Sequence, residues 1–268
     1  MESIECNSYK EIAVRQLNQI SHIELNNPSR KNMLSRIMIE ELLHFTKKME
    51  TDPTCRAIII NGKGNHFCAG TDLEWLLKGQ AQSKQQNISD AKLFFDLYEV
   101  LYFFPKPVIS IVTHDVSGGG IGILACSDIV IAHHDIRMSF PEVSLGLVPA
   151  TIAPFVAKKT GSAFARRMML TAETFTAQQA FSAGLVTDLV APEEMEERLN
   201  QITTRILKNG PRATQLTKQM INHFEDNHEI DDLMAVYCTK LVAAARASEE
   251  GQEGVTAFLE KRKTYWNQ

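Results

Sequence analysis

Two segments with small residues, glycine among them, could place bare backbone N–H groups at the starts of helices. NHFCAGTDLEW (residues 65–75) and SGGGIG (residues 117–122) each follow an apolar run typical of a strand and precede a helix-like sequence. The first helical turn has unpaired N–H donors and the positive end of the helix dipole. Two such starts facing each other would form an oxyanion hole, which stabilises negative charge developing on an oxygen. Alternatively, the glycines only permit tight packing, and a phosphate site is the weakest interpretation because the GxGxxG spacing and a phosphate-binding lysine are absent.

A single glutamate stands in unusually apolar surroundings. Glu142 lies in the segment MSFPEVSLGLVP, next to Pro141 and close to Phe140, Val143 and Leu145. Burial among such neighbours would raise the pKa of the carboxyl group, which suits a residue that both takes and gives a proton. The alternative is a glutamate that opens a helix, since proline followed by glutamate is a common helix start.

The composition limits the classes of partner and cofactor. The chain has 268 residues, a net charge of −4 and an apolar content of 44%, which argue for a globular protein that does not bind nucleic acid or membranes. Its five cysteines show no CxxC spacing, so we expect reduced thiols in the cytoplasm and no metal site. His133, His134 and Asp135 are adjacent, but residues at a strand end point to opposite faces, so we expect them to be solvated.

The elements that must position these residues alternate between strands and helices. Ile- and Val-rich runs separated by amphipathic helices predict a mainly parallel sheet with right-handed crossovers. From about Phe155 onward the pattern is helical. We therefore expect an α/β core over residues 1–195 that holds the site and a helical region over residues 196–268. The polar segment 79–89 is expected to be a mobile loop beside the site.

The order and spacing of the motifs resemble the crotonase (enoyl-CoA hydratase/isomerase) superfamily. The resemblance rests on FCAGTDLEW, GGGIG with CSDIVIA, and FPEVSLGLVP, and it continues through NPSRKNMLS, LTAETFTAQQAFSAGLVTDLV and EEGQEGVTAFLEKRK, nearly the whole chain. It is closest to the methylglutaconyl-CoA hydratase and carboxygeranoyl-CoA hydratase-like group. It implies a crotonase (ClpP/crotonase-like) α/β fold, a spiral of ββα units with a C-terminal helical region that forms a homotrimer or a dimer of trimers.

The resemblance also assigns roles to individual residues. The substrate would be an acyl-CoA thioester without a separate cofactor, and its carbonyl oxygen would lie between the N–H groups of Thr71 and Gly119. Glu142 would transfer protons. The expected contacts to coenzyme A are made by residues around both loops: Arg30, Lys31, Met33, Ala69, Asp72 and Leu73. Lys261 or Lys263 of a neighbouring subunit would add a cation, although both also fit a solvated charge run.

One position departs from the pattern of typical hydratases, which use two glutamates. The first of these lies two residues after the glycine triplet, where this chain has Gly122. Four alternatives follow. The first is a hydratase with one carboxylate that acts on a branched substrate such as 3-methylglutaconyl-CoA. The others are a 3,2-enoyl-CoA isomerase, a decarboxylase, and an acyl-CoA-binding homologue without catalysis. In the hydratase, Glu142 would act on water and on the α-carbon in turn, or a carboxylate of the substrate would orient the water.

A helix next to the first motif carries a series of aromatic residues. We expect this helix to begin at a cap formed by Ser89 or Asp90 and to end before Pro105. Its aromatic side chains should mostly pack in the core, and part of the series is expected to line the acyl pocket together with Trp75. The series consists of Phe94, Phe95, Tyr98, Tyr102 and Phe103.

Overall fold

The centre of the fold is a seven-stranded sheet, described here from a computed structural model that covers residues 4–5, 9–227 and 229–267. The strand order is β1-β2-β3-β4-β5-β7-β10. The strands are β1 (Ile4–Glu5), β2 (Ile12–Leu17), β3 (Ile20–Leu25), β4 (Ala57–Gly62), β5 (Val108–Val112), β7 (Ile129–His133) and β10 (Asp188–Val190). The β2–β3 pair is an antiparallel hairpin, and β3, β4, β5, β7 and β10 are parallel. The predicted parallel sheet is therefore present.

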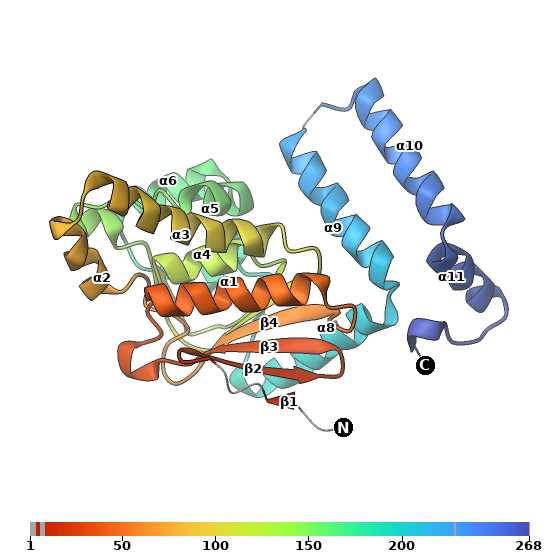
Figure 1. Ribbon diagram of the computed structural model, residues 1–268, viewed down its shortest axis with the longest axis horizontal. Coiled ribbons are helices and arrows are strands. Elements are labelled where there is room, and N and C mark those ends of the chain that lie inside the picture. The colour runs from red at the N-terminus through yellow and green to blue at the C-terminus, as the bar shows by residue number, and fades with distance from the viewer. Residues whose placement is uncertain (1–3, 6–8, 228, 268) are drawn as a thin grey trace.

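Helices cover both faces of this sheet, which explains its continuous apolar strands. On one face, Ile58 and Ile60 of β4 pack in a core shared with α1 (Arg36–Thr51) and α3 (Lys84–Tyr102). On the other face, Ile59 packs with α8 (Met195–Lys208). Figure 1 shows α1 and α3 on one side of β2–β4 and α8 on the other. Consecutive isoleucines thus serve opposite faces, as the alternation of side chains along a strand requires.

A small second sheet supports the glycine-rich turn. It has the order β6-β8-β9 and consists of β6 (Val116–Ser117), β8 (Arg137–Ser139) and β9 (Phe175–Thr176). The remaining helices of the core are α2 (Leu73–Lys78), α4 (Gly119–Ala125), α5 (Ala153–Thr160), α6 (Ser162–Thr171) and α7 (Ala177–Ser182). Short 3₁₀ turns lie at η1 (Pro28–Arg30), η2 (Gly79–Ala81), η3 (Glu142–Leu145), η4 (Pro192–Glu194) and η5 (Tyr265–Asn267). Because α4 begins directly after β6, the sheet fixes where that helix starts.

The segment between α2 and α3 differs from the sequence-based expectation. Residues 79–89 are not a loop: η2 follows α2 directly, and α3 begins at Lys84. The Ser83 hydroxyl accepts a hydrogen bond from the Gln86 N–H, and the Gln86 side chain accepts one from the Ser83 N–H at 2.9 Å. This capping box starts the helix. The predicted start at Ser89 or Asp90 is therefore wrong, because the first turns of α3 are polar and solvent-exposed and lack an apolar signal.

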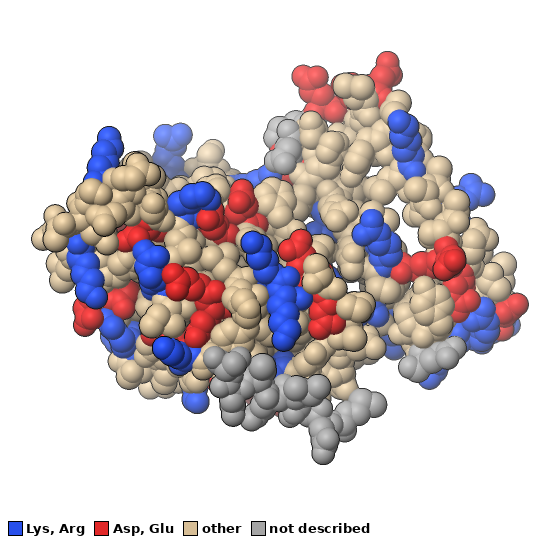
Figure 2. Space-filling view, in the orientation of Figure 1, with Lys and Arg blue, Asp and Glu red and all other residues tan. Residues whose placement is uncertain are grey.

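The C-terminal helices α9 (Pro211–Asp226), α10 (Asp232–Ala247) and α11 (Glu249–Leu259) project from the core in Figure 1. No residue of α10 is buried among those the structure describes. Large apolar side chains are exposed here, with Phe258 82% and Leu233 77% accessible. Figure 2 shows charges of both signs interspersed over the visible face. Among the described residues, no helix is long and apolar enough to cross a membrane.

Candidate active site

The first loop, which contains Gly70 and Thr71, is held by pairing with the segment before α1. The Leu34 N–H donates to the Gly70 carbonyl oxygen at 2.8 Å, and the Asp72 N–H donates to the Leu34 carbonyl oxygen at 3.2 Å. Successive N–H groups of an extended chain point to alternate sides, so the Thr71 N–H points away from Leu34. It has no hydrogen-bond partner within the described residues. Thr71 thus presents a free, rigidly held donor.

The second loop is fixed in the same way. The Ser117 N–H donates to the Cys68 carbonyl oxygen, and the Gly118 N–H donates to the Ser139 carbonyl oxygen, both at 3.0 Å. Gly118 has φ +48°, a left-handed conformation that side chains rarely adopt. Helix α4 then begins at Gly119, whose N–H belongs to the unpaired first turn. In the part of the chain that the structure describes, this N–H also has no partner.

The two loops meet at one cavity. A Cβ atom added to Gly70 would lie 3.6 Å from the Gly119 nitrogen, and one added to Gly119 would lie 3.8 Å from the Thr71 Oγ1. Thr71, Gly119 and Glu142 all line a cavity of about 310 Å³. Two unpaired N–H groups at the edge of an enclosed space can stabilise a developing oxyanion.

Glu142 stands beside the second loop at the start of η3. A Cβ atom added to Gly118 would lie 2.9 Å from the Glu142 Oε1. The Oε2 atom is buried and has no hydrogen-bond partner among the described residues. Burial raises the pKa of the Glu142 carboxyl group above its usual value. Pro141 precedes η3 and Glu142 is its first residue, so the helix-opening position expected from the sequence is present, while the unpartnered Oε2 also leaves the carboxylate free to exchange protons.

The space next to Gly122 is filled. A Cβ atom added there would lie 2.5 Å from Ile152 Cγ2 and 2.6 Å from Tyr98 Cε1, distances that real Cβ atoms essentially never show. Tyr98 is fully buried and lines the cavity. No second carboxylate could enter from this position without moving the ring. From the sequence, Tyr98 is only one member of an aromatic series, since nothing local indicates which helix it faces.

The residues expected to contact coenzyme A gather around the first loop, with one exception. Ala69 and Leu73 line the cavity, and the Ala69 N–H donates to the Lys31 carbonyl oxygen at 3.0 Å. Met33 follows in the same paired segment, half-buried, while Lys31 is exposed. Lys261 follows α11, which lies far from α2 in Figure 1. One chain alone therefore does not bring Lys261 to the other residues.

Arg30 and Asp72 form an ion pair at the rim of this loop. The Arg30 Nη2 lies 2.9 Å from the Asp72 Oδ1 and 3.1 Å from the Glu74 Oε2. Asp72 is 4% exposed and also caps α2 by accepting from the Glu74 N–H. These contacts of its side chain therefore hold Asp72, the residue that follows Thr71, in place. The Arg30 guanidinium already has two carboxylate partners.

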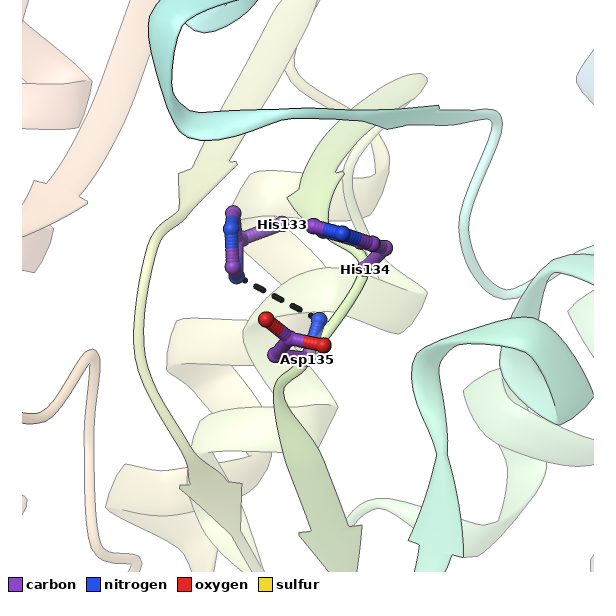
Figure 3. Close-up of side chains that lie close together, drawn as sticks. All are labelled: His133, His134 and Asp135. Carbon is purple, nitrogen blue, oxygen red and sulfur yellow. Dashed lines mark hydrogen bonds between the residues drawn. The ribbon is translucent and has the colours of Figure 1, made fainter.

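Three adjacent residues at the end of β7 lie closer together than expected. His133, His134 and Asp135 were expected to point to opposite faces, but their potential ligand atoms lie within 4.8 Å of one another. Figure 3 shows them around the turn, where the Asp135 N–H donates to the His133 Nδ1 at 3.3 Å. The expectation was wrong because β7 ends at His133 and the chain turns immediately. This cluster does not line the cavity, and His134 and Asp135 are exposed to solvent.

The chain is similar to known proteins over nearly its whole length. The family described as enoyl-CoA hydratase/isomerase matches residues 15–268. A crotonyl-CoA hydratase from Syntrophomonas wolfei is 30% identical, covering 96% of this chain and 97% of the relative, and a 2,3-dehydroadipyl-CoA hydratase from Escherichia coli is 28% identical, covering 94% and 96%. The crystal structure of an enoyl-CoA hydratase from Shewanella pealeana superposes with a TM-score of 0.93 at 32% identity, covering 97% of both chains. The expected crotonase fold is confirmed, and the chain belongs to the enoyl-CoA hydratase/isomerase family.

Proposed function

We propose that this protein adds water across the double bond of 2-enoyl-CoA thioesters, with Glu142 as its only acid–base group. The observation that carries the proposal is the cavity itself, where two unpaired N–H groups and one buried, unpartnered carboxylate oxygen meet. The hydratase names of several relatives at about 30% identity support the reaction type.

The reaction follows from these three groups. The thioester carbonyl oxygen accepts hydrogen bonds from the Thr71 and Gly119 N–H groups, which draw electron density from the double bond. Water attacks C3 while the Glu142 carboxylate takes one of its protons. The resulting enolate is stabilised in the oxyanion hole, where one donor typically contributes about 2.7–4 kcal/mol. Glu142 then returns the proton to C2, so the carboxylate is regenerated and one water molecule is consumed.

Isomerisation is the second candidate, favoured by the filled space beside Gly122. A single carboxylate can remove a proton from C2 of a 3-enoyl-CoA ester and return it to C4.

To separate hydration from isomerisation, the protein is incubated with 2-hexenoyl-CoA in ¹⁸O-labelled water, and the products are resolved by mass spectrometry. We expect labelled 3-hydroxyacyl-CoA. Conversion to 3-hexenoyl-CoA alone would favour the isomerase, and absence of both products, together with no exchange of the α-protons of hexanoyl-CoA in deuterated water, would favour a binding protein.

The cavity's charges favour an uncharged acyl chain. Its lining is mainly apolar, and its charged residues are two carboxylates, Glu142 and Asp90, with no lysine or arginine among the lining residues. Asp90 is already engaged by the Trp75 Nε1 at 2.7 Å and by Arg36. A substrate carboxylate would be buried there without a cation, which is costly. This argument favours crotonyl-CoA or 2-hexenoyl-CoA over the 3-methylglutaconyl-CoA considered from the sequence.

Comparing kcat/KM between these esters tests the substrate class. We expect at least about a tenfold preference for 2-hexenoyl-CoA over 3-methylglutaconyl-CoA, equivalent to about 1.4 kcal/mol of differential binding to the transition state. A preference for the carboxylated ester would contradict this part of the proposal. It would instead support a role for the substrate carboxylate in orienting water.

The pH dependence of hydration should report the buried glutamate. Only the ionised form of Glu142 accepts a proton from water, and burial disfavours that form. As the pH falls through the raised pKa, the group becomes protonated and kcat/KM for crotonyl-CoA should fall. The midpoint should lie above the ordinary value for glutamate, about 4.3. Initial rates across the range in which the protein stays folded provide the measurement, and an acid limb at or below that value would contradict burial of an active carboxylate.

We also propose that the chain assembles into trimers or dimers of trimers through its C-terminal helices. Exposed apolar side chains on α10 and α11, including Leu233, Val242 and Phe258, support a covered surface in the assembly. Light scattering coupled to size-exclusion chromatography should give the mass of three or six chains. A monomer at micromolar concentration would contradict the proposal.

A further inference from the structure

We propose that Tyr98 is a positioning residue of the oxyanion hole, acting on the reaction through the backbone of Gly119. The inference deepens the proposed function and rests on it for the reaction that is affected. Tyr98 belongs to α3, and its hydroxyl donates a hydrogen bond to the Gly119 carbonyl oxygen at 3.0 Å. The residue that supplies one N–H of the hole is thus tied by its carbonyl group to a separate helix.

The turn needs such an external contact because it lacks side chains. Residues 118–120 are all glycine, and a chain without Cβ atoms has many accessible conformations. The Gly118 N–H is bound to the Ser139 carbonyl oxygen, which fixes the turn just before the donor. The Tyr98 hydroxyl fixes it just after the donor. The Gly119 N–H lies between these two attachments, so its direction is set before substrate arrives, as electrostatic stabilisation of an oxyanion requires.

The Tyr98 ring also explains two glycines on one face of α4. Gly119 and Gly122 are three residues apart, so they lie on the same side of the helix. A Cβ atom would lie 2.8 Å from the Tyr98 hydroxyl oxygen at Gly119 and 2.6 Å from the ring at Gly122. The tyrosine therefore lies along a groove made by both glycines. Its ring fills the space beside Gly122 while its hydroxyl reaches Gly119.

The surroundings keep the hydroxyl in its role as a donor. Tyr98 is fully buried, and its ring packs against Phe155 with the ring centroids 6.2 Å apart. Burial holds the pKa of Tyr98 well above its usual value, so the group stays protonated. Because the hydroxyl belongs to a fully buried side chain, its removal would leave the Gly119 carbonyl oxygen without that bond.

Tyr98→Phe tests the inference, because the variant keeps the ring and loses only the hydroxyl. We expect kcat for 2-hexenoyl-CoA hydration to fall about tenfold, the upper range for one hydrogen bond. The dissociation constant of saturated hexanoyl-CoA should change less than about twofold, since the N–H groups act mainly on the developing oxyanion. Tyr102→Phe is the matched control: it lies one turn further along α3, and its hydroxyl contacts Glu225 outside the cavity.

A spectroscopic measurement separates positioning from a general loss of stability. Hydrogen bonds to the carbonyl oxygen of cinnamoyl-CoA polarise its conjugated system and shift its absorption to longer wavelength. We expect this shift on binding to wild-type protein and to Tyr102→Phe, and a smaller shift with Tyr98→Phe. The shift is measured on bound ligand, so it reports on folded protein even if part of the variant unfolds.

The outcomes are distinguishable. Wild-type kcat together with a wild-type spectral shift in Tyr98→Phe would overturn the inference and leave Tyr98 as a packing residue. A wild-type protein that shifts the cinnamoyl-CoA spectrum but hydrates no ester would refute the proposed function alone. In that case, a reduced shift in Tyr98→Phe would still support the positioning role.

Discussion

Glu142→Gln should lower kcat for crotonyl-CoA hydration by about 10³-fold, within the range for loss of a general acid–base group. The amide has nearly the same shape as the carboxylate but neither takes a proton from water nor returns one to C2. Because the Glu142 Oε2 has no partner among the described residues, an amide nitrogen at this position breaks no hydrogen bond of the carboxylate. Steady-state rates and the affinity for hexanoyl-CoA measure the effect, and the affinity should remain close to that of the wild type.

Glu173→Gln is the matched control for this variant. Glu173 is an exposed carboxylate that pairs with Arg167 and does not line the cavity. Its replacement should leave kcat unchanged. If Glu142→Gln kept more than about a tenth of the wild-type rate, a second acid–base group would have to exist and the one-carboxylate mechanism would be wrong. Asp90 would then be the first residue to examine, as the other carboxylate of the cavity.

Several parts of the site could be predicted because their signals are local. The switch from a strand to a helix start rich in small residues occurs within a few residues and located the two loops, and the family resemblance singled out Thr71 and Gly119 within them. Glu142 stood out through its immediate apolar neighbours. The start of α1 carries a local signal too, since Ser35 caps the helix by accepting from the Met38 N–H. These segments converge because β6 and β8 are parallel neighbours in the small sheet, which brings the Gly118 turn beside Glu142, and the Ser117 N–H joins this sheet to the first loop at the Cys68 carbonyl oxygen.

The remaining features depend on contacts between distant elements. The short strand β10 was not expected, since its three residues are held by parallel pairing with β7 rather than by their own pattern. The positions of Tyr98 and Asp90 required knowing that α3 packs beside α4 and α2. Apolar periodicity shows that a helix has a buried face but not which partner it faces. From the sequence, Gly122 is interpreted as the position of an absent catalytic carboxylate. In the structure, the Tyr98 ring fills the space beside it.

Gly122→Glu should prevent stable folding, although it introduces the residue that typical hydratases carry at this position. Its Cβ atom alone would overlap Ile152 and the Tyr98 ring, both fully buried or nearly so. The carboxylate would also be buried without a cation, which costs several kcal/mol out of a typical total stability of about 5–15 kcal/mol. Soluble yield, circular dichroism and thermal unfolding measure the outcome.

Gly122→Ala isolates the steric part of this effect. Overpacking a core costs about 1–3 kcal/mol, whereas replacing glycine by alanine inside a helix gains up to about 1 kcal/mol, so we expect a net loss of about 1–2 kcal/mol in urea unfolding. Gly254→Ala in α11 is the control, because its Cβ atom would lie an ordinary 3.5 Å from Trp266, and this variant should unfold no earlier than the wild type.

Adding Ile152→Ala to Gly122→Ala should relieve part of the overlap, so that the double variant is more stable than the sum of the single effects predicts. If Gly122→Ala were instead as stable as the wild type, the Tyr98 ring would have room to move, and the position would be open to the water or side chain that a two-group hydration mechanism needs.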